Sequence, residues 1–242
     1  MKKGLASFGW ILLLLPFLSV AGTSTLLHSV AETSRPSDER NVSGFHAVSS
    51  SGSFEVHITM GSSEKLRIEG DEDQLSRIET KVENGILKIG YKRQAGLQRS
   101  ATRAKVYITA KSVDALTLSG SGNIEVEGDI RGESLNTKVS GSGSITFSAV
   151  VSHLTAAISG SGDLTASGSA DDCELSISGS GEFSGKNFKT KKAGVKVSGS
   201  GSVNLHVANE LNAVIRGSGN VHYSGDPVVR QDRSGSGKVS KN

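Results

Sequence analysis

Histidine side chains are the residues of this sequence that could most directly bind a metal ion or move a proton. His206 and His222 stand at different positions relative to the Gly-Ser-Gly motif that precedes each of them, so they do not form an obvious metal pair. His57 lies on the polar side of an alternating segment. We therefore expect exposed polar histidines and no metal site.

Two acidic clusters are candidates for sugar-cleaving chemistry, which needs carboxylates that converge on one bond. Asp171 and Asp172 are adjacent, so on a strand they would point to opposite faces. The acidic run at 71–73 is interpreted as a charged turn. A polysaccharide-active lyase or hydrolase, with a site near residues 94–103, is therefore kept only as the alternative function.

Cys173 is the only cysteine of the chain, so it cannot form an internal disulfide. In the repeat described next it falls in register with Leu135, Leu154 and Leu211. This position predicts a small buried hydrophobic residue and not a nucleophile.

A glycine-rich motif recurs at a nearly fixed period. Ser-Gly-Ser-Gly begins at Ser119, and six further copies or close variants follow at spacings of 21, 19, 19, 20, 18 and 18 residues. Such spacing is typical of the coils of a solenoid. A tight corner between two strands usually needs a positive φ, which glycine adopts without strain, although the sequence leaves open which glycine of each pair adopts it. The predicted corner residues are Gly120, Gly122, Gly141, Gly143, Gly160, Gly162, Gly179, Gly181, Gly199, Gly201, Gly217 and Gly219.

Apolar residues recur at equivalent positions of the coils. One column precedes the corner and comprises Leu118, Val139, Ile158, Ile177, Val197 and Ile215. A second follows it and comprises Ile124, Ile145, Leu164, Phe183, Val203 and Val221. A looser third comprises Val126, Phe147, Ala166, Gly185, Leu205 and Tyr223. The outward column between the last two comprises Glu125, Thr146, Thr165, Ser184, Asn204 and His222.

These columns predict an all-β fold, a right-handed parallel β-helix with coils of about 18–21 residues. Parallel stacking places like residues about 4.8 Å apart, so each column becomes a continuous ladder. A calcium-binding nonapeptide solenoid does not fit, because its turns carry a ligand aspartate where this chain has the second apolar column.

The segment before the repeat is less regular. Residues 48–56 align with residues 118–126, which predicts that the first coil begins there. Further strands are expected at 65–69, 80–82, 86–91 and 105–110, with a tight turn at Asn84-Gly85 and a protruding loop at 94–103.

The N-terminus has the pattern of a secretory signal peptide. Lys2 and Lys3 precede an apolar stretch, and small residues end at Ala21 and again at Ala31. We expect a signal peptide at 1–31, cleaved after Ala21 or Ala31, a flexible lead-in at 32–43, and no transmembrane segment after cleavage. The formal charge of +3 includes both leader lysines, so the remaining charge of about +1 does not indicate nucleic-acid binding.

Several motifs resemble a known bacterial family. They are Gly-Phe at 44–45, Ser-Gly-Ser-Phe-Glu-Val at 51–56, Ile-Glu-Gly-Asp at 68–71, Val-Glu-Asn-Gly-Ile-Leu-Lys-Ile at 82–89, and the serial corners. Over about residues 44–225 the chain resembles the putative auto-transporter adhesin head GIN domain family. The resemblance implies a secreted or surface β-helix and brings no catalytic residues with it.

The sequence therefore predicts an exported, non-enzymatic β-helix module at 44–225, followed by a polar C-terminal cap or tail at 226–242. Its expected role is adhesin-like or structural, in the periplasm, at the cell surface or secreted. Repeat solenoids bind through extended faces, so the expected partner is an envelope glycan or protein. No cofactor, metal or nucleic acid is expected.

Overall fold

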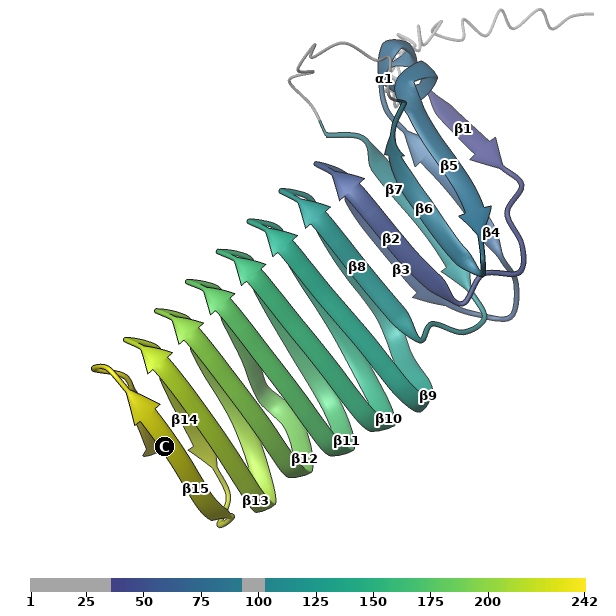
Figure 1. The fold of residues 1–242 in the computed structure, drawn as a ribbon. Coiled ribbons are helices and arrows are strands. Elements are labelled where there is room, and N and C mark those ends of the chain that lie inside the picture. The colour runs from purple at the N-terminus through teal and green to yellow at the C-terminus, as the bar shows by residue number, and fades with distance from the viewer. Residues whose placement is uncertain (1–35, 93–102) are drawn as a thin grey trace, which may run out of the picture. The chain divides into compact units, whose positions relative to one another are not determined.

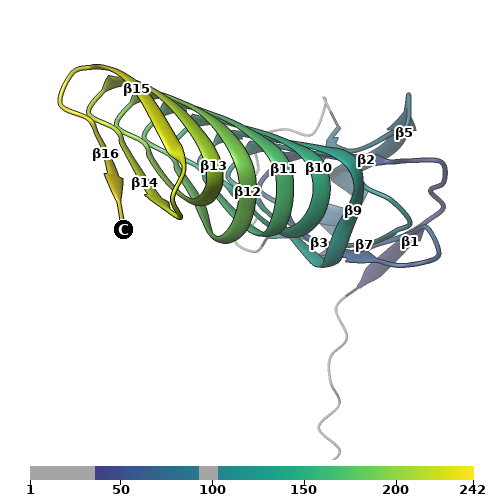
Figure 2. The ribbon, with the colours of Figure 1, turned by 90° about the horizontal axis from the view of Figure 1, so that it is seen from below.

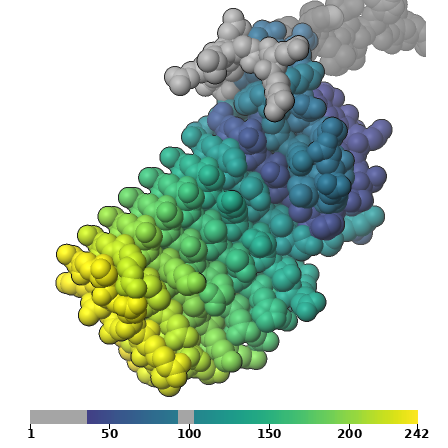
Figure 3. All heavy atoms as spheres, in the orientation of Figure 1, coloured from purple at the N-terminus to yellow at the C-terminus, as the bar shows by residue number. Residues whose placement is uncertain are grey.

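From residue 115 onward the strands stack side by side in chain order (Figure 1). The computed structural model describes residues 36–92 and 103–242. The repetitive part comprises β8 (Ala115–Gly120), β9 (Asn123–Gly141), β10 (Ser144–Gly160), β11 (Asp163–Gly179), β12 (Glu182–Gly199), β13 (Ser202–Gly217), β14 (Asn220–Ser224), β15 (Val228–Ser234) and β16 (Lys238–Lys241). All pairs within this series are parallel. The coils appear as successive bands of colour in Figure 3, and β15 and β16 of the last coil lie on different sides of the winding (Figure 2).

The predicted apolar columns line the inside of the coils. Val139 is in register with Leu118 on one side and with Ile158 on the other, and the column after the corner continues from Ile124 to Val221. Members of both columns are at most 3% exposed. Each buried aliphatic side chain contributes about 1.5–3 kcal/mol, and only the stack provides that burial. The all-β, parallel β-helix is confirmed; its right-handed winding stays a prediction.

The two glycines of each corner meet different constraints. The first has a positive φ, +114° at Gly160 for example, which side chains rarely allow. A Cβ on the second, at Gly162, would lie 2.6 Å from the carbonyl oxygen of Gly143 in the preceding coil. Of the predicted corner residues, positive φ belongs to Gly120, Gly141, Gly160, Gly179, Gly199 and Gly217. Close approach to the backbone of the preceding coil applies to these glycines as well, and it is the constraint on Gly122, Gly143, Gly162, Gly181, Gly201 and Gly219.

The N-terminal part reverses the expected order of the coils. Its strands are β2 (Ala47–Gly52), β3 (Glu55–Met60), β4 (Lys65–Glu69), β5 (Ile78–Glu83), β6 (Ile86–Tyr91) and β7 (Lys105–Ala110). β2 lies between β6 and β8, and β3 lies between β7 and β9. The coil that comes first in the chain is therefore second in the stack, because the chain folds back onto its outer side before continuing.

The alignment predicted for this first coil is wrong by two residues. The pattern matched residues 48–56 to 118–126, but Gly52 pairs with Gly120 and not with Gly122. A shift of two residues keeps every inward side chain inward, because the side-chain period of a strand is two. The doubled Ser-Gly unit fits both alignments, so the pattern alone could not separate them.

Two further segments differ from expectation. Residues 32–43, predicted as a flexible lead-in, contain strand β1 (Ser37–Arg40), which pairs antiparallel with β4. The Arg40 guanidinium anchors it by donating to the carbonyl oxygens of Leu75 (3.2 Å) and Ile78 (3.0 Å) and to the Thr80 hydroxyl (3.0 Å). These partners are distant in sequence, so local composition gave no sign of the strand.

The acidic run at 71–73 starts a short helix and is not only a charged turn. Helix α1 spans Glu72–Arg77 and has Asp71 at its N-cap. The Gln74 amide oxygen accepts a hydrogen bond from the Asp71 backbone N–H at 3.2 Å, and acidic residues in the first turn suit the helix dipole. In the part of the chain described, no helix has the length and apolar character needed to cross a membrane.

The chain continues the stack through residues 226–242. The inward column before the corner ends there in Arg233, whose guanidinium donates to the carbonyl oxygen of Gly237 at 3.1 Å. Arg216 and Asp232 form an ion pair on the outside, at 2.6 Å. Charged residues beside the last strands discourage pairing with a further strand. The predicted signal peptide at 1–31 and the loop at 94–103, apart from Arg103, lie outside the described residues.

Candidate binding surface

The outward side of the strands after the corners forms one continuous polar surface, which we call the outer sheet face. Its strands run in the order β1, β4, β7, β3, β9 and then from β10 to β14 and β16. The predicted outward column lies along it, from Glu125 through Thr146 and Thr165 to His222. Neighbouring strands are about 4.8 Å apart, so hydroxyl, amide and imidazole groups recur at regular intervals.

A packed cluster of polar side chains covers the N-terminal end of this face. The guanidinium carbon of Arg67 lies 4.7 Å from the centroid of the Tyr107 ring, and the His57 ring stacks on Tyr107 with its centroid 5.4 Å away. His57 Nε2 is 3.2 Å from Glu55 Oε1, and its Nδ1 is 3.6 Å from Glu125 Oε2. Tyr107 belongs to β7, which lies between β4 and β3. Arg67 from β4 and His57 from β3 therefore cover its ring from both sides, and the ring cannot stack on a sugar.

Tyr107 is a site residue that the sequence reasoning missed. Burial raises the pKa of its phenol, and the charge of Glu69 and a hydrogen bond to that carboxylate raise it further. The phenol is therefore protonated at neutral pH and donates to Glu69, which also pairs with Arg67. The available signal was the alternation in β7, where Tyr107 stands between the buried Val106 and Ile108.

The side chains of His206 and His222 do not form a pair in the structure. His206 Nδ1 lies 3.0 Å from the Ser224 hydroxyl, and His222 Nδ1 lies 2.9 Å from the Ser240 hydroxyl. Each therefore contacts a hydroxyl of the next coil. Among residues 36–92 and 103–242, no group of three or more His, Cys, Asp or Glu side chains is placed to hold a metal ion.

Asp171 and Asp172 both face outward, contrary to the prediction that they point to opposite faces. Asp171 pairs with Lys191 Nζ at 2.7 Å and Asp172 with His153 Nδ1 at 3.4 Å. The strand ladder skips Asp171 on both sides, so the alternation is interrupted there. A hydrogen bond from Lys191 and its charge lower the pKa of Asp171, as in an ordinary ion pair. Cys173 is 1% exposed, which confirms its predicted burial, and this burial raises the pKa of its thiol.

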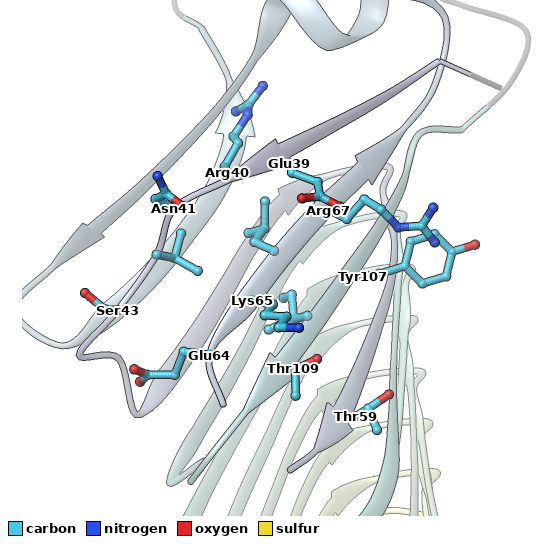
Figure 4. A pocket seen from close by; sticks show the side chains of 13 residues that line it. Glu39, Arg40, Asn41, Ser43, Thr59, Glu64, Lys65, Arg67, Tyr107 and Thr109 are labelled. Carbon is cyan, nitrogen blue, oxygen red and sulfur yellow. The ribbon is translucent and has the colours of Figure 1, made fainter. Parts of the chain in front are cut away.

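A groove of about 720 Å³ opens beside the Arg67–Tyr107 pair (Figure 4). β1, β4, β7 and β3 line it together with the segment at 41–43. Lys65, Thr109 and Thr59 come from three adjacent strands and are in register with one another. Leu66 and Ile108 also belong to the lining, but each is only 2% exposed. Val42 and the carbon atoms of the polar side chains make the groove surface about equally polar and apolar.

Comparison with known proteins gives a family and a fold. A family model described as "Putative auto-transporter adhesin, head GIN domain" matches residues 44–227. A putative adhesin of Bacteroides fragilis has a TM-score of 0.79 and 20% identity, covering 86% of this chain and 96% of that one. A putative lipid binding protein of Parabacteroides distasonis has a TM-score of 0.71 and 23% identity, covering 87% and 98%. A putative adhesin of Parabacteroides merdae has a TM-score of 0.68 and 21% identity, covering 87% and 97%.

None of these three structures is named as an enzyme. At 20–23% identity their likeness to the chain shows the fold alone. No curated protein matches the chain.

Proposed function

The chain belongs to the putative auto-transporter adhesin, head GIN domain family, and from this premise we propose that it is an exported, non-enzymatic binding module of the bacterial cell envelope or surface. Its partner is an envelope glycan, held along the outer sheet face. The family description supports an adhesin-like role, and the predicted signal peptide supports export.

The regular outward column of the outer sheet face is the observation that carries this proposal. Thr146, Thr165, Ser184 and Asn204 present hydrogen-bonding groups from four consecutive coils, all in register. A repeating polymer can meet such a ladder with one similar contact per coil, so weak individual contacts add up along the chain. The backbone ladder holds the groups in place, so little entropy is lost on binding.

The carboxylates and histidines named above are exposed and paired with one another, and this arrangement favours binding over catalysis. His57 lies between Glu55 and Glu125, His153 pairs with Asp172, and these side chains are all at least 32% exposed. An exposed, mutually paired set lacks the enclosed geometry in which an acid and a base act on one bond. A polysaccharide-active enzyme is therefore the weaker reading of this surface.

Lipid binding, the property named for the Parabacteroides distasonis protein, has less support in this chain. Among the described residues, the exposed large hydrophobic side chains are Tyr91, Val150 and Val228. They come from β6, β10 and β15 and do not form a contiguous apolar patch of the kind that acyl chains require.

A pull-down of the purified protein with isolated envelope glycans tests the proposal. The wild type should retain intact glycan, and the variant Thr146→Arg/Thr165→Arg should lose most of it, because two large charged side chains then stand in the column. The control is Ser176→Arg, which places the same residue at an exposed position of the part of β11 that precedes the corner, outside the outward column. Equal retention by all three proteins, or glycan fragments detected by mass spectrometry, would contradict the proposal.

A further inference from the structure

The groove beside Tyr107 has fixed walls. On one side the Arg40 guanidinium ties β1 to backbone carbonyls of α1 and β5. At the far end the Glu64 carboxylate accepts a hydrogen bond from the Gly44 backbone N–H at 3.2 Å and lies 3.6 Å from Lys111 Nζ. With only 12% of its side chain exposed, Glu64 fixes Gly44, which directly follows the segment at 41–43 that lines the groove. A ligand would therefore meet a site that is already formed.

The side chains within the groove differ in whether their bonding capacity is used. Arg67 is paired with Glu69, and Thr59 donates to Glu127 at 3.4 Å. Lys65 and Thr109 lie next to each other across the β4–β7 pair, and their side chains form no hydrogen bond or ion pair with the rest of the described chain. The groove thus contains an ammonium group and a hydroxyl group that are free to bind a ligand (Figure 4).

From this arrangement we infer that the groove binds an acidic saccharide, with the sugar carboxylate at Lys65 and sugar hydroxyls at Thr109, Asn41 and Glu39. The inference rests on the proposed glycan-binding function and names the sugar class. A carboxylate suits a free ammonium, and a charge-assisted hydrogen bond is about twice as strong as a neutral one. Sugar hydroxyls both donate and accept, so they suit a lining that mixes hydroxyl, amide and carboxylate groups.

Other ligand classes fit the groove less well. An acyl chain would cover the charged groups of Lys65, Glu39 and Glu64 without offering them hydrogen bonds, which is costly. A polyphosphate would need several unpaired cations, whereas Lys65 shares the groove with Glu39 and Glu64. One free ammonium among hydroxyl and carboxylate groups matches one carboxylate on a polyhydroxylated ring.

Isothermal titration calorimetry with a trisaccharide of galacturonic acid, and with the neutral galactose trisaccharide, tests the inference. The wild type should bind the acidic trisaccharide at least tenfold more tightly, and Lys65→Ala should remove that preference. Lys196→Ala is the matched control, since Lys196 is also exposed but lies in β12, outside the groove. Raising the salt concentration should weaken only the binding of the acidic sugar.

Two results would overturn the inference: equal affinity for both sugars, or Lys65→Ala binding the acidic sugar as the wild type does. The pull-down with envelope glycans separates this failure from a failure of the proposed function. If the glycans are retained through Thr146 and Thr165 while the trisaccharide does not bind, the groove inference alone is wrong. If neither binds, both are wrong.

Discussion

Individual glycines in this molecule are required by backbone geometry and not by side-chain packing. We predict that Gly160→Ala lowers the free energy of unfolding by more than about 1 kcal/mol. The residue has φ +114°, and a Cβ would lie 2.5 Å from the carbonyl oxygen of Gly141 in the preceding coil. Gly160→Val should cost more, because the branched side chain is larger. Urea unfolding followed by circular dichroism measures both changes.

Gly132 supplies the control for this prediction. It has no positive φ, and a Cβ there would meet nothing within 4 Å. Gly132→Ala should therefore change stability by less than about 0.5 kcal/mol. Equal losses for the two alanine variants would mean that strand propensity, and not the corner geometry, determines the effect.

Removal of the buried hydroxyl group of Ser50 and removal of that of Thr190 should change the free energy of unfolding in opposite directions. The Ser50 hydroxyl is fully buried in the apolar column before the corner and has no hydrogen-bond partner among the described residues. Ser50→Ala should raise the free energy of unfolding by about 1 kcal/mol, because a desolvated polar group is removed. Thr190 instead donates to the carbonyl oxygen of Lys192 at 2.8 Å, so Thr190→Val should lower stability by a similar amount. Thermal melts of both variants test the signs, and a loss of stability in Ser50→Ala would refute the first.

At the level of strands, the repetitive part could be predicted because its pattern repeats many times. The column from Leu118 to Ile215 is visible in six coils, so an error in one coil is corrected by the others. The first coil occurs once and was misaligned by two residues, a shift that the side-chain period of two does not reveal. The two-residue turn at Asn84-Gly85 was predictable because positive φ at both positions, 52° and 76°, suits those two residues.

The groove could not be predicted, because its walls meet through distant pairings. β1 joins β4, and β4 joins β7, from parts of the chain that share no local pattern. The role of Arg40 depends on carbonyl groups of Leu75 and Ile78, which the sequence does not place near it. Neither of these two antiparallel pairings recurs among the described strands, so they leave no repeat to detect.

The β5–β6 hairpin carries a pH-dependent contribution to stability. Hydrogen bonds from Lys81 and Lys88, together with their charges, hold the pKa of Glu83 at about 2, below its ordinary value of 4.5. Because the folded-state pKa is the lower one, the contribution is fully present above about pH 4.5 and is lost as the pH falls toward 2. An NMR titration of the Glu83 carboxyl carbon should give this low midpoint.

The variant Lys88→Ala should raise the pKa of Glu83, since one hydrogen bond and one positive charge are lost. High salt should raise it as well, because the pair is exposed to solvent. Lys196→Ala, far along the stack, should leave it unchanged. A midpoint near 4.5 in the wild type would show that the lysines do not pair with Glu83 in solution.

For the molecule as a whole, the equivalence of the coils predicts that one of them can be removed. Leu154 and Cys173 occupy equivalent positions, so deletion of residues 155–173 joins two coils without changing any column. The shortened protein should fold, unfold in one transition and have a lower melting temperature, because one interface between coils is missing. Circular dichroism and calorimetry test this.

Deletion of residues 155–164 is the matched control, because it removes about half of a coil and brings strands from different sides of the winding into sequence. This protein should not fold, since the deletion removes the corner glycines Gly160 and Gly162 and leaves a coil too short to pair along its whole length with both neighbouring coils. If both deletions behaved alike, the stability of the stack would not depend on the register of the columns.

The position of β2 and β3 in the stack has a consequence for how the molecule acquires its structure. Both strands pair only with segments that come later in the chain. β2, for example, pairs with residues 86–91 on one side and with residues 115–120 on the other. Closing such long loops is entropically costly, so this step should be slow. Once β2 and β3 have paired with β6 and β7, each later coil can pair with the coil directly before it in the chain and can therefore add quickly. Growth would then run in one direction, and truncation from the C-terminus would shorten the molecule turn by turn, whereas loss of β6 and β7 would stop assembly at its start.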